Sequence, residues 1–365
     1  MFSVDQSKQA DACRFCWMCR HICPVANSTG NEGWTPRARG LMISMIERGT
    51  PYDAEIADAM YHCTLCDACA NDCATGYRPS DFIREARTLA VVGNIAPQEI
   101  MAAIDRIAEE GSIFGAENAA AELRSAIGEL PDKAEVLLFA GQTATHVCPE
   151  VAVSAASLLK KAGVSFTMLA DEPESGAMMI ELMGCTGDVQ AQAAAVAERI
   201  RASGTKTLVV LDPIDAVILR DEYGKWGLLE GVEIRTFTAF LAELIKEGRL
   251  CPRAEVLEAS LQEPVKLTRG LDEEAPFKTL AESVGIELKE LFLHGKMSRC
   301  IGTVVFDFFA PKVIKEMVRV RCEDAQRLGS NVIVTASPDD FWIMRRYAPD
   351  GMEILDIYAL LDRLV

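Results

Sequence analysis

The sequence lacks long apolar runs, nucleotide-binding glycine motifs and an excess of positive charge. No run of 18 or more apolar residues occurs, so we expect no transmembrane segment, and no basic region precedes an apolar stretch as in a secretory signal peptide. Neither a Gly-x-Gly-x-x-Gly motif after a strand nor a P-loop is present, so we expect no flavin or nucleotide site on this chain. These absences predict a protein that neither spans a membrane nor is secreted by a standard signal peptide. We expect it in the cytoplasm, with a peripheral position at the inner face of the membrane, through a partner, as the alternative.

Negative charge dominates the 365 residues, with a formal net charge of −17. Residues 1–95 hold eleven acidic and nine basic side chains, a difference of −2, so −15 lies beyond them. Nucleic acid is a poor partner for such a surface. We interpret most of this acidity as a means of keeping the protein in solution, with a docking role for part of it as the alternative.

Cysteine, by contrast, is plentiful, and eight of the thirteen cysteines form two groups with one spacing. The first group is Cys13, Cys16, Cys19 and Cys23, and the second is Cys63, Cys66, Cys69 and Cys73. Both read C-x2-C-x2-C-x3-C, and Pro24 completes the bacterial ferredoxin signature in the first. Three cysteines of such a loop can reach three irons of one cubane, whereas the fourth lies too far round and ligates the other cluster.

The spacing therefore predicts two [4Fe–4S] clusters with crossed ligands. One would be held by Cys13, Cys16, Cys19 and Cys73, and the other by Cys63, Cys66, Cys69 and Cys23. Zinc and disulfides remain the alternatives, although structural zinc sites usually use C-x2-C pairs with a longer spacer, and cysteines so close in one loop make poor disulfide partners. Ala74 stands where a second proline would be, which weakens the assignment of Cys73 slightly. The odd number of cysteines suits a reducing compartment better than a disulfide framework.

Two further sets of residues lie close to these cysteines. Apolar side chains are interleaved with the first group, and we expect them to keep water off its cluster. They are Phe15, Trp17, Met18 and Ile22. Arg37 and Arg39 lie between the two groups, and either a helix-surface role or compensation of the negative cluster charge would explain them.

Proline and glycine positions predict helices around the cysteine loops. One helix should have Pro36 in its first turn and end at Gly49, and another should run from Pro79 to Ala90. Residues 1–95 then form a helical dicluster ferredoxin-like domain. Residues 96–132 form a connector of two helices.

From about residue 133 the pattern changes to alternating strands and helices. Short apolar runs predict strands at 136–140, 165–169, 207–211 and 232–235. Helices are expected before Gly163, at 188–203 with Asp188 as its cap, from Pro213 and at 237–246. This alternation predicts a parallel sheet covered by helices.

The last hundred residues repeat this unit. Thr-Leu-Val-Val-Leu-Asp-Pro-Ile-Asp at 207–215 is echoed by Asn-Val-Ile-Val-Thr-Ala-Ser-Pro-Asp-Asp at 331–340, with an offset of 125 from Pro213 to Pro338. We expect one repeat at 133–250 and another at 251–365, with an acidic linker near 249–263. The predicted fold class is a multidomain α+β protein, in which the dicluster domain is followed by two duplicated α/β repeats with parallel sheets.

The whole chain resembles the iron–sulfur subunits of the glycolate oxidase and heterodisulfide reductase type. The resemblance rests on the two cysteine motifs, Thr35-Pro36-Arg37-Ala38-Arg39 between them and Glu85-Ala86-Arg87 after the second. That family joins a dicluster ferredoxin domain to duplicated α/β cysteine-rich (CCG) repeats. The resemblance implies electron transfer beside a flavin-containing dehydrogenase carrying FAD or FMN, toward a quinone, a ferredoxin or an electron-transfer flavoprotein. It implies no independent catalytic site on this chain, and a second copy of the chain is a further candidate partner.

The CCG repeats resemble those of the family in spacing but not in ligands. Metal-binding members have a cysteine, then Cys-Cys-Gly, then Cys-Pro-x-Cys. The first repeat has Gln142, Glu174-Ser175-Gly176 and Asp212-Pro213-Ile214-Asp215, and the second has Gly270, Cys300-Ile301-Gly302 and Ser337-Pro338-Asp339-Asp340. Because Cys300 alone cannot hold a multi-iron cluster, we interpret this half as a scaffold whose metal sites are lost. A hard cation such as magnesium or calcium, bound by Asp212, Asp215, Glu174 and Gln142, is the alternative.

Two functional hypotheses follow. The first is an electron-relay subunit, and the second is a catalytic, heterodisulfide-reductase-like subunit with a site between the repeats, using Cys300 or a remodelled pocket. The remaining cysteines fall outside any ligand spacing, and we expect most of them to be small buried hydrophobes. They are Cys148, Cys185, Cys251 and Cys322.

Overall fold

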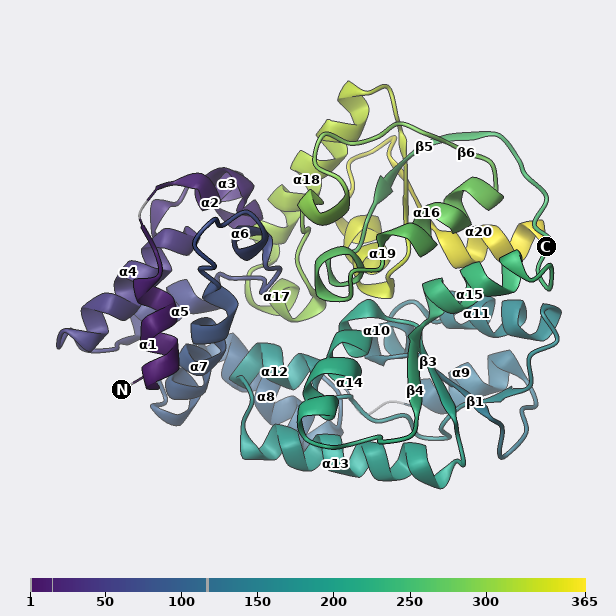
Figure 1. Ribbon diagram of the computed structural model, residues 1–365, viewed down its shortest axis with the longest axis horizontal. Coiled ribbons are helices and arrows are strands. Elements are labelled where there is room, and N and C mark those ends of the chain that lie inside the picture. The colour runs from purple at the N-terminus through teal and green to yellow at the C-terminus, as the bar shows by residue number, and fades with distance from the viewer. Residues whose placement is uncertain (1, 15, 116–117) are drawn as a thin grey trace.

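The structure, a computed structural model, describes residues 2–14, 16–115 and 118–365. A helical N-terminal part is followed by two α/β units, which lie one above the other in Figure 1 with the N-terminal part on their left. Phe15 lies outside the described residues. None of the described helices is both long and apolar enough to cross a bilayer.

Short helices surround the cysteine loops of the N-terminal part. They are α1 (Val4–Asp11), α2 (Met18–Ile22), α3 (Pro24–Thr29), the 3-10 turn η1 (Glu32–Trp34), α4 (Pro36–Glu47), α5 (Ala54–Tyr61), α6 (Ala68–Asn71) and α7 (Pro79–Val92). Pro36 and Pro79 occupy the first helical position as expected, because that position needs no backbone N–H. Two connecting helices follow, α8 (Gln98–Glu110) and α9 (Ala119–Ile127).

The first α/β unit contains a four-stranded parallel sheet in the order β2-β1-β3-β4. Its strands are β1 (Val136–Phe139), β2 (Phe166–Thr167), β3 (Thr207–Val210) and β4 (Glu233–Thr236). Its helices are α10 (Gln142–His146), α11 (Pro149–Lys161), α12 (Ala177–Met183), α13 (Gly187–Ala202), α14 (Pro213–Lys225) and α15 (Phe237–Lys246). All four strands were predicted, but β2 is shorter than expected. The cap of α13 is Thr186, whose hydroxyl accepts from the Val189 amide at 3.4 Å, so the prediction of Asp188 as the cap was wrong.

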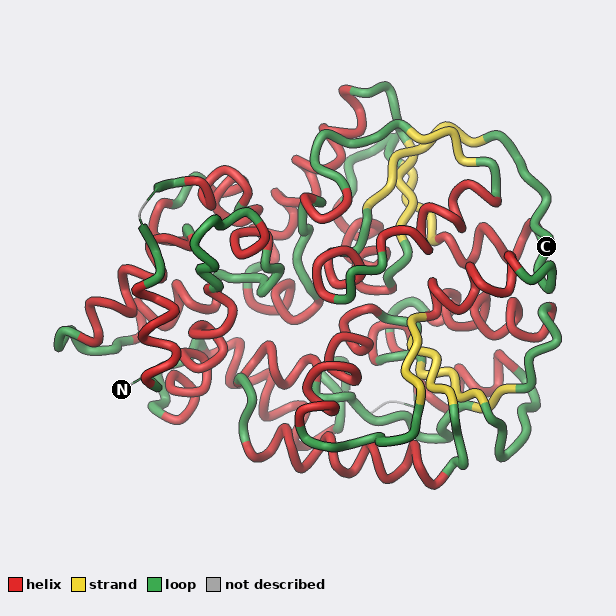
Figure 2. Tube along the Cα trace, viewed as in Figure 1, coloured by secondary structure: helices red, strands yellow, loops and turns green. Residues whose placement is uncertain are grey.

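The second α/β unit has the same strand order, β6-β5-β7-β8, and is again parallel. Its strands are β5 (Leu257–Gln262), β6 (Ile286–Leu288), β7 (Val332–Thr335) and β8 (Glu353–Asp356). Its helical segments are the π-helical turn η2 (Lys266–Gly270), α16 (Glu274–Ser283), η3 (Gly295–Met297), α17 (Val304–Phe309), α18 (Pro311–Arg327), α19 (Pro338–Tyr347) and α20 (Ile357–Leu364). The identical order confirms the predicted duplication and fold class, and Figure 2 shows the two strand groups separately in yellow.

The predicted extent of the acidic linker, near 249–263, was wrong. Residues 257–262, placed in an acidic linker, form strand β5 at the centre of the second sheet, where they pair with β6 and β7. The acidic side chain of Glu258 is exposed, whereas Ala259 and Ser260 are fully buried. The acidic composition of the segment as a whole masked the short buried strand within it.

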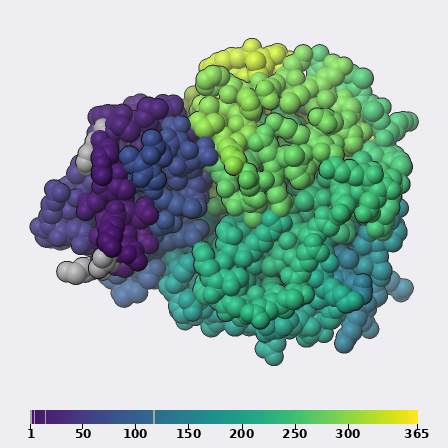
Figure 3. All heavy atoms as spheres, viewed as in Figure 1, coloured from purple at the N-terminus to yellow at the C-terminus, as the bar shows by residue number. Residues whose placement is uncertain are grey.

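The two α/β units share one hydrophobic core. Leu138 and Val209 from the first sheet belong to the same buried cluster as Leu261 and Val334 from the second. Figure 3 shows the N-terminal part as a separate lobe against both units. The Tyr61 hydroxyl crosses this boundary and donates to the Leu182 carbonyl at 2.8 Å.

Candidate metal centre

Two cavities in the N-terminal part are each lined by four cysteines. One, of about 550 Å³, is lined by Cys13, Cys16, Cys19 and Cys73. The other, of about 380 Å³, is lined by Cys23, Cys63, Cys66 and Cys69. We call them the first and the second cavity. Each takes three thiols from one motif and the fourth from the other, so the structure groups the eight residues as the crossed assignment requires.

Equivalent residues turn the backbone of both loops. Trp17 and Asp67 each follow the second cysteine of their motif, and both adopt the left-handed conformation, with φ of 69° and 57°. This conformation is costly for residues other than glycine, and α2 and α6 begin directly after it. The turn wraps each loop around its cavity, and the assignment of the thiols as cluster ligands remains a prediction that this geometry supports.

The first cavity is open to solvent on one side. Cys16 is exposed, and the side chains of Trp17 and Met18 are 50% and 52% exposed although they line the cavity. The Arg37 guanidinium lies 3.4 Å from the centroid of the Trp17 ring, a cation–π contact. Trp17 and Met18 therefore cover the cavity only in part, so the expectation that they keep water away is met only in part. Ile22 is buried as expected.

The second cavity is enclosed by buried arginines. Arg39 is only 1% exposed and lines the cavity, and its guanidinium donates to the backbone carbonyls of Ala59, at 2.8 Å, and His62. Arg87 is 3% exposed and donates to the Cys63 carbonyl. The sequence left open a helix-surface role for Arg39, but the structure places this residue in the buried lining of the second cavity.

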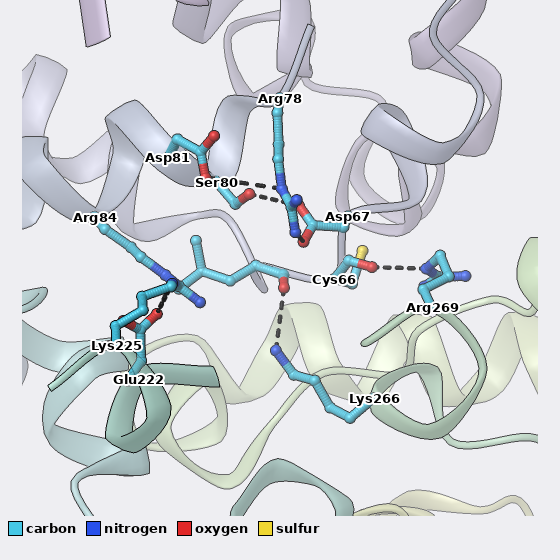
Figure 4. A network of polar contacts seen from close by, with 11 residues as sticks. Cys66, Asp67, Arg78, Ser80, Asp81, Arg84, Glu222, Lys225, Lys266 and Arg269 are labelled. Carbon is cyan, nitrogen blue, oxygen red and sulfur yellow. Dashed lines mark hydrogen bonds and ion pairs between the residues drawn. The ribbon is translucent and has the colours of Figure 1, made fainter. Parts of the chain in front are cut away.

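Two more cations reach the second cavity from the second α/β unit. Lys266 Nζ donates to the Leu65 carbonyl at 3.1 Å, and Arg269 Nε donates to the Cys66 carbonyl at 2.7 Å (Figure 4). Both lie on η2, immediately before the degenerate position Gly270. They were not predicted from the sequence, because nothing in the local pattern shows which loop their side chains contact.

Burial makes three of these thiols harder to ionise in the absence of a compensating charge, whereas the pKa values of Cys66 and Cys73 are lowered. Burial, followed by the neighbouring Cys13 thiol, raises the pKa of Cys19 to about 11, and burial raises that of Cys23 to about 11. Burial likewise raises the pKa of Cys69 well above its usual value. Cys66 differs, because a hydrogen bond from the buried Cys300 thiol holds its pKa well below that value. Four thiols in each cavity, several of them buried, fit a bound metal cluster, whose positive charge would stabilise the thiolates.

A third cavity, of about 340 Å³, lies between the two repeats and next to the second cavity. It brings several degenerate CCG positions together with residues of the cluster loop and η2. Its polar lining consists of Thr64, Asp212, Lys266, Cys300, Thr303, Ser337, Asp339 and Asp340. We call it the inter-repeat cavity. Burial, then the charges of Asp339 and Asp215, raises the pKa of Asp212 well above its usual value.

The other degenerate residues of the first repeat form hydrogen bonds with neighbouring groups of the same repeat. The Glu174 carboxylate accepts from the amides of Gly176, at 2.7 Å, and Met178, at 2.8 Å, and Asp215 accepts from the Ser175 hydroxyl at 2.5 Å. Gln142 donates to the Glu172 carbonyl at 3.4 Å. Within 2–14, 16–115 and 118–365, no group of three His, Cys, Asp or Glu side chains is arranged to hold a single metal ion.

All thirteen cysteines fall in the described ranges, and all are free thiols. Cys148 and Cys322 are buried, as expected for small hydrophobes. Cys185 and Cys251 are exposed, so the expectation was wrong for half of this set. Both exposed thiols lie in turns between elements, where no core surrounds them.

Comparison with known proteins gives an independent view of this site. Residues 9–77 match the 4Fe-4S dicluster domain family. A subunit of the dihydromethanophenazine:CoB–CoM heterodisulfide reductase of Methanosarcina barkeri is 24% identical over 99% of this chain and 93% of its own length. A probable membrane-anchored ferredoxin of Chromohalobacter salexigens is 23% identical over 82% of this chain and 51% of its own length. The EtfAB:quinone oxidoreductase of Syntrophomonas wolfei is 25% identical over 62% of this chain and 34% of its own length.

The alignment therefore spans about half of the ferredoxin relative but nearly all of the reductase subunit. These matches confirm the resemblance first drawn from the cysteine motifs. Residues 9–77 match a 4Fe-4S dicluster domain, and the chain is similar over nearly all of its length to this heterodisulfide reductase subunit and over part of its length to related oxidoreductases.

Proposed function

We propose that this chain is the electron-transfer subunit of a multi-subunit oxidoreductase and relays single electrons through two [4Fe–4S] clusters. The observation that carries the proposal is the crossed grouping of eight cysteines around two cavities. When bound, such clusters supply one-electron redox chemistry. The chain's own residues hold them through thiolates, surround the second with cations and leave the first accessible at Cys16.

A flavin-containing dehydrogenase with FAD or FMN is the proposed electron donor. Flavin takes up electrons in pairs, whereas clusters pass them on singly, so the two kinds of cofactor complement each other. The proposed acceptor is a quinone, a ferredoxin or an electron-transfer flavoprotein. The name of the Syntrophomonas relative, an EtfAB:quinone oxidoreductase, supports acceptors of this class.

The external partner docks, in this proposal, at the open side of the first cavity. Arg37, Leu41 and Met45 follow one another at four-residue intervals on α4, and Leu41 and Met45 are 44% and 43% exposed. Through Arg37 this stripe joins the half-exposed Trp17. These side chains give the surface beside the accessible cysteine loop a partly apolar character, and exposed apolar surface is a feature of interaction sites.

A catalytic role is the second candidate function. The inter-repeat cavity supports it, because the cavity is lined by Cys300, whose thiol contacts Cys66 of the second cavity. Electrons reaching the second cluster would then be within reach of a small molecule held between the repeats. Such a subunit would turn over a substrate by itself.

Metal and sulfide analysis of anaerobically purified protein separates these possibilities. The relay predicts about eight irons and eight sulfides per chain and no turnover by the isolated subunit. Cys251→Ser changes an exposed cysteine outside both cavities and is the control for the effect of losing a cysteine as such. It should retain all the iron. Zinc in place of iron, or a colourless protein, would overturn the proposal. Turnover of a disulfide substrate by the isolated chain, lost in Cys300→Ser, would establish the catalytic alternative.

A further inference from the structure

Four cations donate hydrogen bonds to one short stretch of backbone whose last four residues, 63–66, line the second cavity. Their acceptors are the carbonyls of residues 59–66. The pairs are Arg39 with Ala59 and His62, Arg87 with Cys63, Lys266 with Leu65, and Arg269 with Cys66. The first cavity is lined by two arginines: Arg14 is exposed and donates to the Asp11 carbonyl, and Arg37 stacks on Trp17. Among lining residues alone, the first cavity has two arginines and Asp72, and the second has Arg39 and Asp67. The additional positive charge at the second comes from Arg87, Lys266 and Arg269, which contact its loop from outside the lining.

Two of the four cations belong to the second α/β unit and are held in place there. Arg269 Nη1 donates to the carbonyls of Ser298, at 2.7 Å, and Lys296, at 2.9 Å, while its Nε reaches Cys66. Figure 4 shows Lys266 below the cysteine loop and Arg269 to the right of it, each directed toward the loop. Burial raises the pKa of the Glu181 and Asp339 carboxyl groups, and the positive charge of Lys266 opposes that rise.

Cations in this position favour the reduced form of a cluster. Reduction adds one negative charge, and cluster potential depends on net charge, hydrogen bonding and solvent exposure. Coulombic attraction is screened less in a partly buried site than in water, so a charge near the loop acts strongly there. The same hydrogen bonds satisfy the loop carbonyls, so the loop needs no water as a donor at these positions.

We propose that Lys266 and Arg269 raise the midpoint potential of the second cluster, so that electrons entering at the first cluster collect on the second. They are positioning residues, since they act through the loop that carries Leu65 and Cys66. The second repeat has lost its own metal ligands and instead sets the potential of a cluster in the neighbouring domain. The inference rests on the proposed function, because it requires both clusters. Each cluster takes up one electron from the reductant, with no bond formed or broken and no proton required.

Redox titration of the anaerobic holoprotein with dithionite, followed by electron paramagnetic resonance, tests the inference. Lys266→Gln and Arg269→Gln each remove a charge while keeping an N–H donor for the carbonyl. Each should lower the equilibrium constant for reduction of the second cluster about tenfold, which is ~59 mV for one electron. The first cluster should shift by much less. The signals are assigned with Cys16→Ser, which perturbs the first cluster alone.

Lys296→Met is the matched control. Lys296 lies close by on η3, but its Nζ pairs with Asp272 at 2.8 Å and its side chain is 53% exposed. It should leave both potentials unchanged, and Lys266→Arg should restore the wild-type value. Unchanged potentials in both glutamine variants with full iron, an equal shift of both clusters, or a shift in Lys296→Met as large as in Lys266→Gln would each overturn the inference. Failure of the relay itself would appear differently, as missing iron in the unmutated chain.

Discussion

The Ser337 hydroxyl donates a hydrogen bond to Asp212 Oδ1 at 3.3 Å, although the two residues hold the same position in the two repeats, 125 residues apart. A second equivalent pair, Thr238 and Tyr358, joins its hydroxyls at 2.8 Å. Contacts between equivalent residues arise only where the repeats are related by an approximate two-fold axis that passes between them. The repeats thus face each other through positions at which metal-binding relatives carry cysteine, and in this chain a carboxyl and a hydroxyl meet there.

Buried carboxyl groups of the first repeat should make the stability of the protein depend on pH. Burial raises the pKa of Glu172 and Glu174 to about 7, from an ordinary value of 4.5. The folded state then binds more protons than the unfolded state between these values, so stability is greatest below about pH 4.5 and falls as the pH rises toward 7. Urea unfolding from pH 5.5 to 8 should show a falling midpoint, and Glu174→Gln should flatten part of that fall. An identical pH profile in Glu174→Gln would contradict this explanation.

The crossed ligand assignment can be tested with single cysteine variants. Cys73→Ser should give the spectrum of Cys16→Ser, because both lose a ligand of the first cavity, and Cys23→Ser should give that of Cys66→Ser. Electron paramagnetic resonance of the reduced proteins, with iron analysis, provides the comparison. The opposite pairing, Cys73→Ser with Cys66→Ser, would show that each motif builds its own cluster.

The two clusters should differ in their rate of reaction with small reagents. Cys16 is exposed beside a half-exposed Trp17, whereas none of the four cysteines of the second cavity is exposed. Dithionite should therefore reduce the first cluster faster, and Trp17→Ala should widen the difference several-fold by uncovering the loop further. Rapid-freeze electron paramagnetic resonance resolves the two signals. Equal rates in both proteins would mean that the reductant does not enter at this opening.

Gly184 lies in close contact with helix α7 of the N-terminal part. It has φ +70°, and a Cβ atom there would lie 2.4 Å from the Arg84 carbonyl oxygen and 2.4 Å from Thr88 Oγ1. Gly204, with φ +74° and nothing within 4 Å, is the matched control. Gly204→Ala should cost about 1 kcal/mol, from the left-handed conformation alone. Gly184→Ala should cost about 2 kcal/mol more, because backbone must also move. Equal midpoints in urea for the two variants would contradict this account.

The sequence predicted those features that depend on local pattern. Cysteine spacing indicated the two groups, proline marked the start of α4 and α7, and short apolar runs marked the strands. It missed Lys266 and Arg269, whose acceptors lie about two hundred residues earlier in the chain. No local periodicity records a contact of that kind, because it depends on how the second repeat packs against the cysteine loop. The exposure of Trp17 was missed for a related reason, since an apolar residue beside a ligand has the same sequence pattern whether it covers the site or borders its opening.

The single core that joins the two repeats limits how the cavity between them can work. Leu138 and Val209 pack in the same cluster as Leu261 and Val334, so hinging the repeats apart would expose apolar surface on both sides. At about 25 cal/mol per Å², opening even a few hundred Å² would consume much of the stability of an ordinary domain. The gap lined by Asp212 and Cys300 is therefore of fixed width, and a molecule that reaches it must be small enough to enter without parting its walls.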